Sequence, residues 1–428
     1  MPRLAILVLF TAACSAGLCA ADAIGWRGDG SGRFDTTVPT SLKPSWQVEL
    51  GRSDSSPIVV QDCVITLADP NRVICLDTKT GAERWSTALT GTSCCNAAQQ
   101  AWMTKALATP ANDKAGWKEL GKTGKGLFTD TGKPSQHGFT AATPVSDGSH
   151  VWVHWGFGFV ACLKLADGST VWEASHATGQ LPELAHDTSP VLIDGKLLLM
   201  GPASINALDA ATGKPLWTTK VKKMGHGSAT PVVVTAGGKQ VIVTPSGAVV
   251  EPTGKVISQI AVGGDQSPAP YAGGAVFANG DGYNRNPQFL ECFDLSDPAK
   301  PTALWKTDDR RDDKGNTSTM SPLVAAGYAY VIDKSGTACW VYDLKTGKKA
   351  TNPVAINGKV PGHTWRPSPA AANNAIIVPI FTGTVTLLAP DGSGKIIAQY
   401  DCKSAISGSP FCADGHLYLR TKESLICF

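Results

Sequence analysis

The chain has 428 residues, of which 43% are apolar and only 17% carry a charge, with 45 glycines and 28 prolines. This composition allows a large core and many turns, which favours a β-rich protein and excludes a disordered, collagen-like or mainly helical one. The formal net charge is +3 and there is no basic run, so nothing indicates binding to nucleic acid or to an anionic membrane surface.

Residues 1–21 have the pattern of an export signal. Arg3 precedes an apolar run over residues 4–10, and small residues follow as far as Ala21. We expect cleavage near Ala21, which would leave the mature protein in the periplasm or outside the cell. A lipid anchor at Cys14 is the less favoured alternative, because a threonine stands three positions before it, where a branched apolar residue is usual. No later stretch approaches the ~18 apolar residues of a membrane helix.

An N-terminal arm over residues 22–43 is followed by a phrase that recurs to the end of the chain. The phrase is a serine or threonine, a proline, an apolar run, a tight turn and a second apolar run. It begins at Ser56-Pro57, Thr143-Pro144, Ser189-Pro190, Thr230-Pro231, Ser267-Pro268, Ser321-Pro322, Ser368-Pro369 and Ser409-Pro410. After a first interval of 87 residues, successive prolines are 46, 41, 37, 54, 47 and 41 residues apart. Such spacings are typical of four-stranded propeller blades, so we predict an all-β, eight-bladed β-propeller over residues 44–428.

The two ends of the chain support the count of eight. The last repeat, residues 409–428, has room for only three strands, and residues 44–50 supply a spare strand just before the first repeat. Pairing of these two segments would close the ring and remove the free sheet edge. An open stack of repeats would instead need polar caps at both ends, and the chain ends on an apolar segment.

A second phrase follows most copies of the first. Its cleanest copy runs from Ala207 to Trp217, with Asp209 and Thr212-Gly213 forming a turn in which glycine adopts positive φ. We expect the tryptophan to pack from the outermost strand onto the neighbouring blade. The phrase AxDxxTGxxxW resembles the tryptophan-docking motif of the PQQ-like (pyrroloquinoline-quinone-type) propeller family, which includes quinoproteins and BamB-like proteins. The resemblance covers nearly all of residues 44–428 and implies the same fold.

Residues 86–140 form an insertion between the first and second blades. Within it, Asn96 is a candidate cap for a short helix that ends before Pro110. A second departure is the loop over residues 280–287 in the fifth blade. Both are expected on the same face of the propeller, and long structured insertions are often functional.

The ten cysteines that follow the leader fall into two kinds. Cys75, Cys162, Cys292 and Cys427 occupy the place of Ala207 in the clean repeat, so we interpret them as small buried apolar residues rather than disulfide partners. The adjacent pair Cys94-Cys95 differs, because a bridge between neighbours is strained. Quinoprotein alcohol dehydrogenases carry such a pair, packed on the quinone, soon after their first docking tryptophan, and this resemblance makes Cys94 and Cys95 candidate cofactor-binding residues. The alternative is that they are two free or separately used thiols in a surface insertion.

A group of polar side chains lies a few residues ahead of the repeat prolines, where the chain enters the innermost strands. We expect these side chains to face the channel mouth, where they form a candidate ligand or partner face or simply bond turn backbone. They are His137, His186, Asp187, His226, His363 and Arg366. None has the close spacing of a strong metal site, and no catalytic motif is present in suitable context.

Two classes of function remain open at this point. The favoured one is an exported, non-catalytic, BamB-like scaffold that presents one decorated face to another exported or outer-membrane protein, or to a small ligand at the channel mouth. The alternative is a PQQ-dependent alcohol or sugar dehydrogenase with calcium. We find no counterpart of the calcium-binding Glu and Asn or of the catalytic Asp that the quinoprotein resemblance implies, so no cofactor is assigned.

Overall fold

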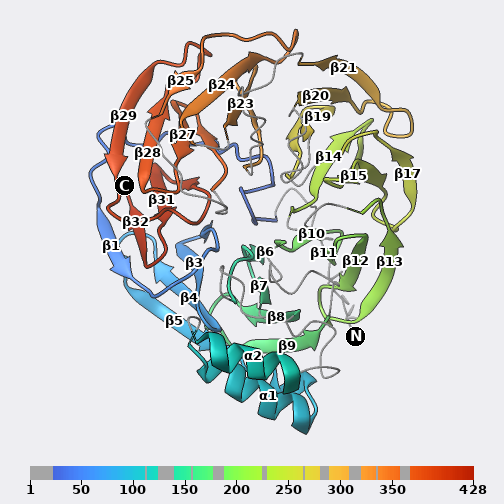
Figure 1. Ribbon diagram of the computed structural model, residues 1–428, viewed down its shortest axis with the longest axis vertical. Coiled ribbons are helices and arrows are strands. Elements are labelled where there is room, and N and C mark those ends of the chain that lie inside the picture. Colours follow the sequence, from blue (N-terminus) through green and yellow to red (C-terminus); the bar gives the residue numbers. More distant parts are fainter. Residues whose placement is uncertain are drawn as a thin grey trace, which may run out of the picture.

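The computed structural model describes residues 23–110, 113–123, 139–155, 158–176, 188–223, 229–263, 266–279, 289–307, 320–333, 336–356 and 367–428. The chain forms eight antiparallel sheets of four strands each, arranged around a central axis (Figure 1). The predicted eight-bladed β-propeller is therefore confirmed. The inner three strands of each blade are almost continuously buried, whereas the outermost strands alternate between exposed and half-buried residues, so the core lies between neighbouring blades.

The first four blades follow the chain from the inner to the outer strand. Blade 1 is β2 (Ile58–Val60), β3 (Cys63–Ala68), β4 (Arg72–Asp77) and β5 (Glu83–Ala88). Blade 2 is β6 (Val145–Ser146), β7 (His150–Trp155), β8 (Phe159–Lys164) and β9 (Thr170–Ser175). Blade 3 is β10 (Val191–Ile193), β11 (Lys196–Met200), β12 (Ser204–Asp209) and β13 (Pro215–Lys220). Blade 4 is β14 (Val232–Ala236), β15 (Lys239–Val243), β16 (Ala248–Val250) and β17 (Val256–Gln259).

The next three blades have the same order. Blade 5 is β18 (Ala269–Tyr271), β19 (Gly274–Asn279), β20 (Phe289–Asp294) and β21 (Thr302–Lys306). Blade 6 is β22 (Leu323–Ala325), β23 (Tyr328–Ile332), β24 (Ala338–Asp343) and β25 (Val354–Ala355). Blade 7 is β26 (Ala370–Ala372), β27 (Ala375–Pro379), β28 (Thr384–Leu388) and β29 (Ile396–Asp401).

Blade 8 joins the two ends of the chain. Its inner strands are β30 (Phe411–Ala413), β31 (His416–Arg420) and β32 (Ser424–Cys427), and its outermost strand is the N-terminal β1 (Trp46–Glu49). Strand β1 pairs antiparallel with β32, with Trp46 opposite Cys427. The predicted closure by the N-terminal strand is confirmed, and it supplies the partner that the open edge of β32 needs.

Two faces of the ring follow from this order. In each blade, the turn between strands one and two and the turn between strands three and four lie on the same face of the ring. We call this face the turn face. The opposite face, where the chain passes from one blade to the next, is the connection face. The insertion after β5 belongs to the connection face, and it contains the 3-10 helix η2 (Thr92–Cys94), α1 (Ala97–Ala108) and α2 (Lys114–Thr123). Asn96 caps α1 as predicted, in a capping box with Gln99.

The repeated serine or threonine before each proline has a single structural role. Its backbone nitrogen donates to the hydroxyl oxygen of the same residue in the next blade, and the eight bonds form a closed circle of buried groups. They run from Ser56 to Thr143 (3.3 Å), Thr143 to Ser189 (2.9 Å), Ser189 to Thr230 (3.0 Å), Thr230 to Ser267 (2.9 Å), Ser267 to Ser321 (3.1 Å), Ser321 to Ser368 (3.0 Å), Ser368 to Ser409 (3.0 Å) and Ser409 to Ser56 (2.9 Å). We call this circle the hydroxyl ring.

The docking tryptophans join the blades near the circumference. Trp172 of blade 2 covers Gly213 in the turn of blade 3, where φ is +71° and a Cβ atom would lie 2.7 Å from the Trp172 ring. Its indole nitrogen donates to the carbonyl oxygen of Ala210 at 3.1 Å. Only glycine fits such a close approach at positive φ. The same contact joins Trp46 to Gly81, Trp85 to Gly168, Trp217 to Gly254 and Trp305 to Gly347, which confirms the predicted docking.

The cysteines of the repeat lie opposite these tryptophans. In the strand registers Cys75 pairs with Trp85, Cys162 with Trp172, Cys292 with Trp305 and Cys427 with Trp46, as Ala207 does with Trp217. All four are buried free thiols. The interpretation of these positions as small buried packing residues is confirmed.

The hydroxyl ring is testable at Ser189. Ser189→Ala leaves the buried backbone N–H of Thr143 without its acceptor, and we expect a loss of roughly 1–3 kcal/mol in the free energy of unfolding. Ser189→Thr keeps the oxygen, as at two other ring positions, and is expected to stay near wild type. The exposed Ser149→Ala is the matched control. Chemical denaturation measures all three, and equal stability of the two Ser189 variants would contradict the role of the hydroxyl.

Candidate functional site

The two-helix insertion is the main addition to the connection face. Trp102 and Met103 of α1 and Trp117 and Leu120 of α2 are buried, and they belong to one apolar cluster with blades 1 and 2. The indole nitrogen of Trp102 donates to the carbonyl oxygen of Leu120 at 2.9 Å, which fastens α1 to α2. Figure 1 shows the pair at the edge of the ring beside β5 and β9. The insertion is therefore a fixed element of the surface.

The end of the insertion is held by a half-buried carboxylate. Asp69, in the loop between β3 and β4, accepts hydrogen bonds from the backbone nitrogen of Phe139 at 2.9 Å and from the hydroxyl of Thr140 at 2.6 Å. Burial raises the pKa of Asp69. The ring of Phe139 lies 5.7 Å from that of Trp117, so this contact reaches the helices.

The outward side of α2 is basic. Lys114, Lys118 and Lys122 recur every four residues and are exposed, whereas Trp117 and Leu120 point to the core. Lys122 is paired with the exposed Glu119 at 3.1 Å, which contributes little to stability. The lysines form a stripe that we call the lysine face.

The adjacent cysteines lie where the insertion leaves blade 1 and meets the outermost strand of blade 2. Both are half-buried free thiols. The Cys94 thiol donates to the carbonyl oxygen of Gly91 at 3.4 Å, and Glu173 of β9 accepts from the backbone nitrogen of Gly91 and the hydroxyl of Ser93. Burial, with Cys95 and Glu173 adding to it, raises the pKa of Cys94 to about 12. Cys94 is therefore a protonated thiol of low reactivity at neutral pH.

The other candidate residues of the sequence fall outside the described ranges. They are His137, His186, Asp187, His226, His363 and Arg366, and the loop over residues 280–287 lies outside them too. Their assignment to the channel mouth stays a prediction.

The N-terminal arm crosses the ring on the turn face, a feature that the sequence did not predict. Arg27 is almost fully buried and donates to the carbonyl oxygens of Pro322 at 3.0 Å and Pro369 at 2.8 Å, in blades 6 and 7. Arg33 donates to the carbonyl oxygen of Pro270 in blade 5, and Ile24 pairs with Ser146 in blade 2. Burial lowers the pKa of Arg27 to about 9. The arm thus ties together blades that are distant in sequence.

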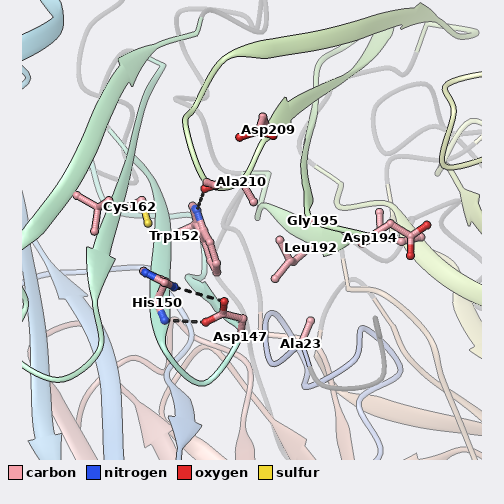
Figure 2. A pocket seen from close by; sticks show the side chains of 13 residues that line it. Ala23, Asp147, His150, Trp152, Cys162, Leu192, Asp194, Gly195, Asp209 and Ala210 are labelled. Atoms are coloured by element: carbon pink, nitrogen blue, oxygen red, sulfur yellow. Dashed lines mark hydrogen bonds and ion pairs between the residues drawn. The ribbon is translucent and has the colours of Figure 1, made fainter. Parts of the chain in front are cut away.

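A cavity of about 440 Å³ opens on the turn face between blades 2 and 3, next to the start of the arm. Figure 2 shows Trp152, whose indole nitrogen donates to the carbonyl oxygen of Ala210 at 2.9 Å, standing between Asp147 and Asp209. Asp147 bonds both the backbone nitrogen and the ring of His150. No local sequence motif marks this cavity, because its walls come from two blades and the arm.

His154 is a buried histidine that the sequence did not single out. It lies in β7, and its Nδ1 is 3.2 Å from the carbonyl oxygen of Thr188. Burial lowers its pKa to about 4, opposed by the bond to Thr188 and assisted by nearby His176. The ring is therefore neutral in the folded protein at pH 7.

Two absences hold for the residues that the structure describes. Among those residues, no group of three or more His, Cys, Asp or Glu side chains is arranged to hold a metal ion. No helix in the same ranges is both long enough and apolar enough to cross a membrane.

The eight blades, the docking tryptophans and the closing strand define a β-propeller of the PQQ-like class. The family model described as outer membrane protein assembly factor BamB matches residues 39–201 and 201–357, and the chain belongs to this family. No curated protein matches the chain significantly in sequence.

Solved structures of both functional classes share the fold. BamB from Moraxella catarrhalis is 15% identical with a TM-score of 0.61, over 90% of this chain and 96% of that one. Quinohemoprotein alcohol dehydrogenase from Comamonas testosteroni is 12% identical with a TM-score of 0.63, over 94% and 79%. A europium-containing methanol dehydrogenase is 12% identical with a TM-score of 0.57, over 92% and 89%. At these identities the likeness shows the fold alone.

The pKa of His154 predicts how stability depends on pH. Below pH 6.5 the unfolded chain binds a proton at His154, but the folded protein does so only near pH 4, so stability falls as the pH drops through this window. We expect a loss of about 2 kcal/mol between pH 7.5 and pH 5 from this group. In His154→Gln, the decrease in unfolding free energy between pH 7.5 and pH 5 is expected to be smaller by this amount. The control His150→Gln, on the same strand, retains His154 and is expected to show the same decrease as the parent protein. The parent's decrease in His154→Gln would contradict the assignment.

Proposed function

We propose that the protein is exported and acts as a non-catalytic scaffold of the BamB type, which binds another exported or outer-membrane protein through its connection face. The observation that carries this proposal is the two-helix insertion, whose buried tryptophans hold it on blades 1 and 2 while the lysine face stays exposed. A fixed helical surface of this kind suits a protein partner more than a small substrate. The leader over residues 1–21 and the family membership support the location.

The surroundings of Cys94 and Cys95 support the scaffold over the PQQ-dependent alternative. The quinoprotein resemblance implies a bridged pair, whereas Cys94 and Cys95 are free thiols. The carboxylate of Glu173 beside them already accepts hydrogen bonds from Gly91 and Ser93. These residues do not fit the cofactor, and no reaction step is assigned to it.

Site-directed photo-crosslinking in cells that make the protein naturally tests this proposal. A photoreactive residue at Lys118, on the lysine face, is expected to give one adduct of defined mass with an envelope protein. The same residue at the exposed Lys345, in a turn of blade 6 on the opposite face, is the control and is expected to give none. Charge reversal at Lys114 and Lys122 should reduce the adduct at Lys118 severalfold, because electrostatic complementarity sets the rate of encounter.

Two results would contradict the proposal. One is the absence of any adduct at Lys118 while the protein is folded and exported. The other is an identical set of adducts from Lys118 and Lys345, which would indicate non-specific contact. Protein that stays in the cytoplasm with residues 1–21 attached would overturn the exported location separately.

A further inference from the structure

The cavity between blades 2 and 3 has an apolar floor. Trp152, Cys162 and Leu192 are buried beneath it, and Val171 stands at its edge on the outermost strand with 45% of its surface exposed. A half-open cavity of about 440 Å³ with aromatic and aliphatic walls has the size and lining of a site for one or two side chains.

The charge around this floor is negative. Asp147, Asp194 and Asp209 line the cavity with His150, and neither lysine nor arginine is among the described residues that line it. Because the whole chain has a formal charge of +3, this negative charge is a local feature. Asp147 and Asp209 are fixed by bonds within their own turns, to His150 and Thr212. The cavity is thus preorganised for a cation with an apolar body.

The cavity continues along the arm. A second cavity of about 220 Å³ shares Ala23 and Leu192 with the first and extends beside Trp26 and Asp29 toward blade 4. The two therefore adjoin and form one groove on the turn face, which we call the acidic groove. It has the shape for an extended segment rather than a compact small molecule.

We propose that the acidic groove binds an extended segment of a partner polypeptide in which lysine or arginine alternates with apolar side chains. In an extended segment successive side chains point to opposite sides, so apolar groups reach the Trp152 floor while cationic groups reach the carboxylates at the edge. The groove lies on the face opposite the helical insertion, so this site is independent of the one proposed above.

Fluorescence anisotropy with a labelled hexapeptide of alternating lysine and leucine tests the groove on the purified, full-length mature protein. We expect saturable binding that weakens between 50 and 300 mM salt, as for a charge-assisted site. A peptide with glutamate in place of lysine, and one with serine in place of leucine, are both expected to bind at least about tenfold more weakly.

Matched variants locate the binding. Val171→Lys puts a positive charge at the edge of the groove and is expected to weaken binding about tenfold. Leu216→Lys makes the same change at the corresponding exposed position of blade 3, 49% exposed, and is expected to leave affinity unchanged. Asp194→Asn removes one charge at a position with φ of +47°, which asparagine tolerates, and is expected to weaken binding about threefold.

The outcome of these measurements decides the proposal. It is overturned if the glutamate peptide binds as well as the lysine peptide, or if no saturable binding occurs. It is also overturned if Val171→Lys and Leu216→Lys have equal effects while both variants melt like the parent protein. Loss of photo-crosslinking at Lys118 has no bearing on it, so the two proposals fail separately.

Discussion

The hydroxyl ring is the constraint on which the rest of the molecule depends. Each blade contributes one backbone donor and one hydroxyl acceptor, and each bond needs the neighbouring blade in place, so the circle is complete only when all eight blades are present. The proline that follows has no N–H to leave unpaired on the inner edge of the sheet. This explains why the phrase of serine or threonine with proline recurs at every blade, whereas the tryptophan does not.

Further contacts join the blades at the circumference and across the ring. At the circumference the docking tryptophans pack on glycines of the next blade, as Trp172 does on Gly213. Blade 6 lacks the tryptophan, and there the aromatic ring of Tyr328 packs on Gly392 of blade 7. Across the ring the arm places the buried Arg27 on the carbonyls of blades 6 and 7. These contacts join neighbouring and distant blades, and the helical insertion and the acidic groove lie on opposite faces of the ring that results.

The sequence predicted those features that local patterns encode. The spacing of prolines gave eight blades, the spare segment before Ser56 gave the closing strand, and Asn96 gave the start of α1. It did not predict α2, whose Gly116 and Gly121 lower its intrinsic helix propensity and whose stability comes from the buried Trp117. Nor did it predict the contacts of the arm or the groove, because these join residues up to hundreds of positions apart. The histidines near the channel mouth lie outside the described residues, so that prediction stands untested.

We propose that this propeller binds partners and does not carry out quinone chemistry. The most direct test of this proposal is a titration of the purified protein with PQQ and calcium, followed by quinone absorbance and by dye reduction with an alcohol. Because Cys94 is a protonated free thiol and not part of a bridged pair, we predict no saturable PQQ binding and no alcohol-dependent dye reduction. Stoichiometric binding of PQQ accompanied by alcohol-dependent dye reduction would contradict it.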